Sequence, residues 1–171
     1  MNTTPVTGER ADLLATLGQH RYFLRHTVRE LTEEQIRQRP TVSELTLGGL
    51  IKHVAATELQ WARFIVEGPA AVGDMSEEAV AAWSQEFVVG EGDTLESLLA
   101  SYEKVAAETD RLVAELPDLD ASQPLPEAPW FEAGARWSAR RVFLHIIAET
   151  SQHAGHADIL RESIDGQKTM G

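Results

Sequence analysis

The stretch VFLHIIAETSQHAGHADIL, residues 142–160, carries the pattern from which the architecture of the whole chain can be predicted. Its apolar positions recur at alternating steps of four and three residues, which is the spacing of one buried face of a helix. The residues on this seam are Val142, Ile146, Glu149, His153, His156 and Leu160. The stretch therefore predicts a helix that packs against other helices and carries a carboxylate and two imidazoles in its buried face.

Three further segments outside this stretch show helical periodicity, and none shows the sustained alternation of a strand. The predicted long helices span residues 8–30, 46–68, 94–116 and 138–164. Thr46 and Ser138 are predicted N-caps, each flanked by the apolar pair of a hydrophobic staple. These features predict an all-α fold, a four-helix bundle with a crossover connection and short extra helices, as one domain over residues 1–171.

The two long connections that follow the second and third long helices differ in composition and periodicity. Residues 117–137 hold four prolines and two tryptophans without periodicity, and we expect them to form the crossover and to shape a substrate site. Residues 69–93 include a short amphipathic piece over 76–87, which we expect to cover one end of the bundle. A further short helix is expected after Thr32, ending before Pro40.

Composition excludes several classes of partner. The net charge of -12 argues against binding to nucleic acid or an anionic membrane surface, because both require clustered basic residues. No apolar run approaches the roughly 18 residues of a membrane span, and no signal peptide is recognisable. The chain has no cysteine, so its own residues supply no thiolate chemistry. A soluble, cytoplasmic protein that acts on a small-molecule substrate is expected.

The polar members of the seam are candidate metal ligands. Glu149 and His153 are four residues apart, about 40° around a helix axis, so their side chains can converge on one atom. His53 also points inward, on the apolar face of the helix over 46–68. Burying such groups costs several kcal/mol unless they pair or bind a cation. Two imidazoles and one carboxylate suit zinc or another first-row ion and leave coordination positions open, as catalysis requires.

Simpler interpretations exist for each of these residues. His53 could be a hydrogen-bonded core histidine, and Glu149 with His153 could form a buried charge pair. His156 could be a partner of the ligands, a fourth ligand that closes the site, or a solvent-facing residue. Trp61 could line the pocket or could simply pack in the core.

The sequence around His53 (Leu50-Ile51-Lys52-His53) and the HAGHADIL motif resemble the DinB/YfiT-like superfamily of metal-dependent proteins. The resemblance implies a four-helix bundle in which His53 and two residues of the last helix bind a divalent metal, often zinc or nickel. By position these two are Glu149, where a histidine is usual, and His153. The same His, Glu, His set is similar to the metal-binding domain of mycothiol-dependent maleylpyruvate isomerase.

The resemblance implies a thiol S-transferase or thiol-dependent isomerase that activates a thiol or water at the metal, and it favours a homodimer. In this interpretation His156 is the catalytic proton shuttle and Trp61 forms a wall for the low-molecular-weight thiol. The alternatives are a non-catalytic metal site and a metal-free interaction or ligand-binding bundle. Arg161 and Asp158 lie off the seam and are expected to form a surface or dimer-contact pair.

Overall fold

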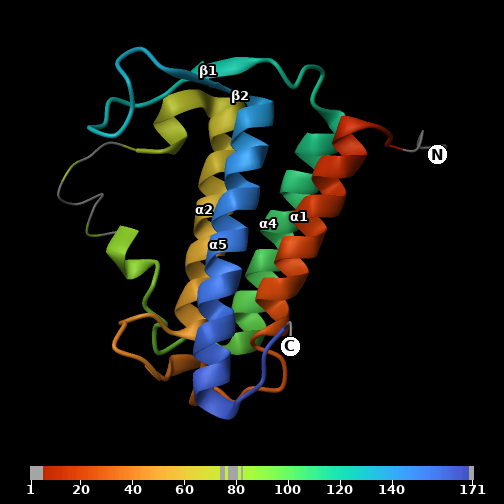
Figure 1. The fold of residues 1–171 in the computed structure, drawn as a ribbon. Coiled ribbons are helices and arrows are strands. Elements are labelled where there is room, and N and C mark those ends of the chain that lie inside the picture. The colour runs from red at the N-terminus through yellow and green to blue at the C-terminus, as the bar shows by residue number, and fades with distance from the viewer. Residues whose placement is uncertain (1–5, 74–75, 77–80, 82, 170–171) are drawn as a thin grey trace.

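Four long helices form a bundle in the computed structural model, which describes residues 6–73, 76, 81 and 83–169. They are α1 (Glu9–His26), α2 (Leu47–Glu67), α4 (Leu95–Glu115) and α5 (Ala139–Asp165). α1 packs against α5, α5 against α2 and α2 against α4, while α1 and α4 close the ring (Figure 1). The predicted all-α four-helix bundle is confirmed.

Short elements occupy the connections. They are two 3₁₀ turns, η1 (Gln35–Arg37) and η2 (Gly68–Ala71), and an antiparallel pair of strands, β1 (Ser122–Pro124) and β2 (Arg136–Ser138). The strands were not predicted, because three residues are too few to show an alternating pattern. Of the predicted amphipathic piece, residues 77–80 and 82 lie outside the described part of the chain, and residues 83–85 are helical.

Local chemistry explains where three of the long helices begin and where α5 ends. Three of them start at the caps Thr46, Thr94 and Ser138, and each hydroxyl accepts a hydrogen bond from the backbone N–H three residues later. Such bonds satisfy N–H groups that have no partner inside the helix. α5 ends at Gly166, whose φ of 79° is readily adopted only by glycine.

α1 ends four residues earlier than predicted, at His26, and a distant side chain explains the difference. Arg161 of α5 is buried, and its Nη1 donates to the carbonyls of Thr27 and Arg29 at 2.9 and 2.8 Å. These bonds give a donor to carbonyl groups that follow α1 and have no partner inside the helix. The prediction that Arg161 and Asp158 form a surface pair is wrong, because Arg161 closes α1 and Asp158 binds the C-terminal segment.

The connection between α2 and α4, residues 68–94, joins opposite ends of the bundle. α2 ends at the end of the bundle that carries the two strands, whereas α4 begins at the opposite end (Figure 1). The connection 117–137 stays at one end, between the last turn of α4 and the first turn of α5. The prediction that residues 117–137 form the crossover is therefore wrong, because prolines and tryptophans mark irregular backbone but do not specify its direction.

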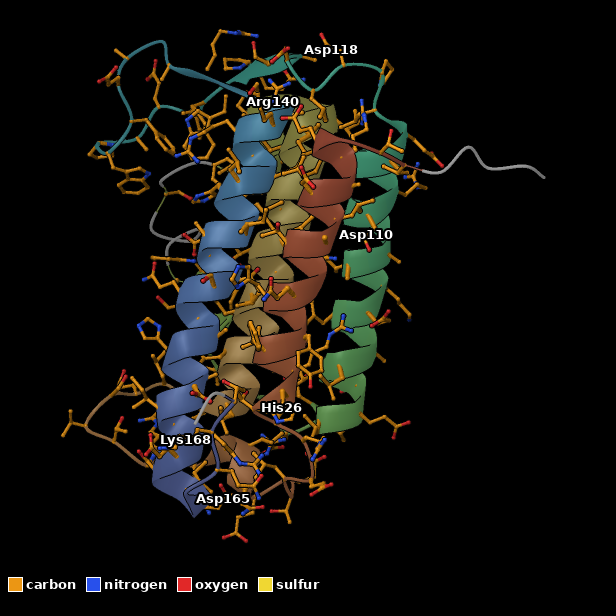
Figure 2. All side chains as sticks on the ribbon, turned by 45° about the vertical axis from the view of Figure 1, so that its right-hand side comes forward. His26, Asp110, Asp118, Arg140, Asp165 and Lys168 are labelled. Carbon is orange, nitrogen blue, oxygen red and sulfur yellow. The ribbon has the colours of Figure 1, made fainter. Side chains whose placement is uncertain are left out.

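An ion-pair network is buried between three helices. Arg21 of α1 donates to both carboxylate oxygens of Glu58 on α2, at 2.5 and 3.2 Å. It also pairs at 2.7 Å with Asp110, which faces α1 from α4 (Figure 2). Arg21 and Glu58 are 4% and 1% exposed, so they form a charged link inside the core.

The polar seam of α5 lies where two apolar clusters meet. One cluster includes Leu50, Tyr102 and Leu160, and the other includes Phe64, Val113 and Phe143. Along α5, Glu149 falls between Ile146 of the second cluster and Ala154 of the first. The seam therefore occupies the middle of the bundle. Among the described helices, none is long and apolar enough to cross a membrane.

Candidate metal centre

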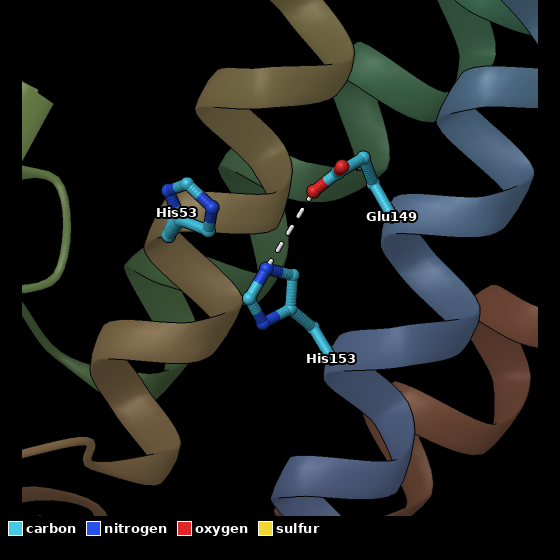
Figure 3. A group of neighbouring side chains, drawn as sticks. All are labelled: His53, Glu149 and His153. Atoms are coloured by element: carbon cyan, nitrogen blue, oxygen red, sulfur yellow. Dashed lines mark ion pairs between the residues drawn. The ribbon is translucent and has the colours of Figure 1, made fainter. Parts of the chain in front are cut away.

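Three side chains from two neighbouring helices converge in the middle of the bundle. His53 projects from α2, and Glu149 and His153 project from adjacent turns of α5 (Figure 3). Each offers one ligand atom, and these atoms all lie within 4.8 Å of one another. The structure thus brings together the three residues that the sequence singled out as candidate ligands.

The electrostatics of this triad favour a charged carboxylate. Nε2 of His153 lies 3.7 Å from Oε2 of Glu149, and this contact lowers the pKa of Glu149 although burial opposes the shift. The Glu149 side chain is 30% exposed and that of His153 is 11% exposed, while His53 is buried. Of the three side chains, that of Glu149 is the most exposed to solvent.

The donor set fits a first-row divalent ion. Bonds of about 2.0 to 2.2 Å to imidazole nitrogen and carboxylate oxygen, at tetrahedral angles, place two ligand atoms about 3.3 to 3.6 Å apart. The candidate ligand atoms lie within 4.8 Å of one another, so a bound ion requires side-chain rotations that bring them closer by up to roughly 1 Å.

His156 lies beside the triad rather than in it. Its Nδ1 is 3.4 Å from Nδ1 of His153, one turn earlier on α5, and the two rings meet edge to face. Because Nε2 of His153 is the atom nearest Glu149, His156 contacts the opposite edge of the ligand ring. This is the place of a partner that fixes the orientation and the tautomer of a ligand.

Glu86 and Phe87 contact His53 from outside the bundle, and the sequence analysis missed both. Oε2 of Glu86 lies 3.2 Å from Nδ1 of His53, and the ring of Phe87 stacks on the imidazole at a centroid distance of 3.9 Å. Glu86 is 33 residues from His53 and follows no spacing that relates the two. No signal in the sequence could have paired them.

Among the described residues, Trp61 is connected to the triad through His145. Its ring stacks on Trp137 at 4.9 Å and meets the ring of His145 at 4.8 Å. His145 in turn lies 3.9 Å from Glu149, and burial lowers its pKa so that the neutral imidazole is favoured. Trp61 itself is 6% exposed. These rings form an aromatic wall next to the triad, defined here as Trp61, Trp137 and His145.

Comparison with known proteins identifies the family. A family model described as mycothiol-S-transferase matches residues 12–166, whereas no curated protein matches the chain. The match covers α2, α4 and α5 in full, and α1 from residue 12 onward, so it includes both helices that supply the triad. It also confirms the resemblance to the DinB/YfiT-like group. The chain belongs to the mycothiol-S-transferase family.

Proposed function

We propose that this chain is a metal-dependent S-transferase that uses a low-molecular-weight thiol to attack an electrophilic small molecule. The observation that carries the proposal is the convergence of His53, Glu149 and His153 within a chain of a thiol-transferase family. We propose zinc as the ion, with nickel or another first-row ion as the alternative, because imidazole and carboxylate ligands suit each of them.

We propose a role for each residue that is consistent with its position. A bound divalent ion would lower the pKa of a thiol or a water at an open coordination position. Glu149 supplies the negative charge that offsets part of the cation. His156 accepts the Nδ1–H of His153, which leaves Nε2 free to bind, and it carries a proton away from the site. Trp61 and the rest of the aromatic wall provide an apolar surface for the thiol or the electrophile.

The reaction can be tested directly with mycothiol, or an analogue, and an aryl chloride. During transfer the sulfur–carbon bond forms, chloride leaves and the thiol proton passes to solvent. We expect the wild type to form the thioether faster than Glu149→Ala by at least about tenfold, because removal of even an outer partner of a metal site costs that much. Product formation and thiol loss are measured together.

Glu162→Ala is the matched control for this assay, because Glu162 is an exposed carboxylate on the same helix and, in the part of the chain that the structure describes, its side chain pairs with Lys168 at the surface. It should keep the rate of the wild type. Equal rates in the wild type and in Glu149→Ala would contradict a transferase that works through this site. A thiol-dependent isomerase would share the thiol addition but release no chloride, and the family match favours transfer.

The second candidate function is a closed, non-catalytic metal site in which His156 is a fourth ligand. The contact of His156 with the far edge of His153 favours an open site instead. We therefore expect His156→Gln to keep the metal content of the wild type while thioether formation slows. Elemental analysis of tag-free protein decides the question, since a sharp fall in metal content in this variant would support the closed site.

A further inference from the structure

A short segment of the connection between α2 and α4 packs against the beginning of α2. We call residues 86–90 the strap. Nζ of Lys52 donates to the carbonyl of Val88 at 2.9 Å, and Nη1 of Arg37 donates to the carbonyls of Val89 and Gly90 at 2.9 and 3.1 Å. Two cations from different elements thus hold the backbone of the strap.

Two adjacent glycines in the first turn of α2 make room for the strap. A Cβ atom on Gly49 would lie 2.2 Å from the carbonyl oxygen of Phe87, and one on Gly48 would lie 2.9 Å from Cγ2 of Val89. Neither contact is possible in a real structure, so only glycine allows the strap this close. Glycine is a poor helix former, and here its absence of a side chain serves the packing of the strap.

The strap brings Glu86 and Phe87 onto His53. Glu86 engages Nδ1 at 3.2 Å, and Phe87 stacks on the ring, which together leave Nε2 as the nitrogen that can face Glu149 and His153. A carboxylate that accepts Nδ1–H fixes the tautomer in which Nε2 carries the lone pair. The hydroxyl of Thr57 lies 3.4 Å from that same Nε2.

We propose that Glu86 is the positioning residue for the ligand His53, and that Gly48 and Gly49 form the seat for the strap that carries Glu86. This inference rests on the proposed metal site, and it predicts that the affinity of that site for the metal depends on Glu86. Outer partners of metal ligands contribute about 10- to 100-fold in metal affinity. We expect Glu86 to contribute in this range, because its partner ring is buried and clamped by Phe87.

The test measures zinc affinity by competition with a chromophoric chelator, in the full chain. Glu86→Gln should weaken binding by about 10- to 100-fold, and Glu86→Asp should recover part of the loss, because it keeps a carboxylate. Gly49→Ala should weaken binding in the same direction by displacing the strap. Gly18→Ala is its control, since a Cβ there meets nothing within 4 Å, and it should bind zinc as the wild type does.

A second measurement needs no metal. Long-range ¹H–¹⁵N spectra of the metal-free protein should show His53 protonated at Nδ1 in the wild type and at a mixture of nitrogens in Glu86→Gln. Unchanged zinc affinity and an unchanged tautomer in Glu86→Gln would overturn the inference while the metal site stands. A wild type that binds no zinc would overturn the proposed function instead, and the tautomer would then still decide whether Glu86 orients His53.

Discussion

Replacing His153 by alanine should abolish metal binding. His153 offers the ligand atom on α5 that lies next to Glu149, and without it two of the three side chains of the triad remain. The loss in affinity should exceed the roughly 10- to 100-fold that removal of an outer partner costs. Elemental analysis of tag-free protein purified without added metal should give close to one ion per wild-type chain and none in the variant.

Thermal unfolding provides an independent check of this prediction. An ion that binds only the native state stabilises it by about 2.7 kcal/mol when its concentration is 100 times the dissociation constant. A chelator should therefore lower the Tm of the wild type and leave that of His153→Ala unchanged. His26→Ala, at the last residue of α1 (Figure 2), changes a histidine that is not part of the triad and should behave as the wild type. If the wild type contains no metal, takes up none and keeps the same Tm with chelator, this prediction is wrong and the triad is a buried hydrogen-bonded cluster.

The sequence predicted those parts of the fold that depend on near neighbours in the chain. The predicted caps at Thr46 and Ser138 act over three residues, and the seam of α5 repeats within one helix. The end of α1 was misplaced because it depends on Arg161, more than 130 residues away. Periodicity reports which face of a helix is buried, but it carries no information about such a partner.

The candidate site also has parts that depend on near neighbours in the chain and a part that depends on a distant residue. Glu149 and His153 were predictable as a pair because one helix holds both, and His53 because it lies on the apolar face of α2. Glu86 was not predictable, because its contact with His53 depends on the path of the crossover. The tandem glycines before His53 allow the strap to pack against α2, but they do not indicate which residue of the strap contacts His53.

Several expectations stay predictions. They are the single domain, the homodimer, the cytoplasmic location, the identity of the ion, and the roles of Trp61 and His156. None of them is determined by how the described helices pack. The aromatic wall shows that Trp61 lies next to His145 rather than next to the ligands, so any contact with a thiol would involve the whole wall.

The second large effect is expected on stability, from Arg21→Met. The substitution leaves Glu58 as a carboxylate that is 1% exposed and has lost both of its bonds from Arg21. Breaking a buried pair by removing one partner costs about 3 to 5 kcal/mol, because the remaining charge stays desolvated. For a chain of this size that corresponds to a fall in Tm of roughly 10 °C. Urea and thermal unfolding, both with chelator present, measure the fold without any contribution from metal.

Two further variants separate charge from packing. Arg111→Met breaks the exposed pair of Arg111 with Glu115 on the surface of α4 and should change stability by no more than about 0.5 kcal/mol. The double variant Arg21→Met with Glu58→Leu removes both buried charges, and its stability should return most of the way to that of the wild type. Asp110, 46% exposed, stays hydrated in this background and needs no replacement partner. A double variant as unstable as Arg21→Met alone would show that the network stabilises the bundle through shape and hydrogen bonding, and not by cancelling the charge of Glu58.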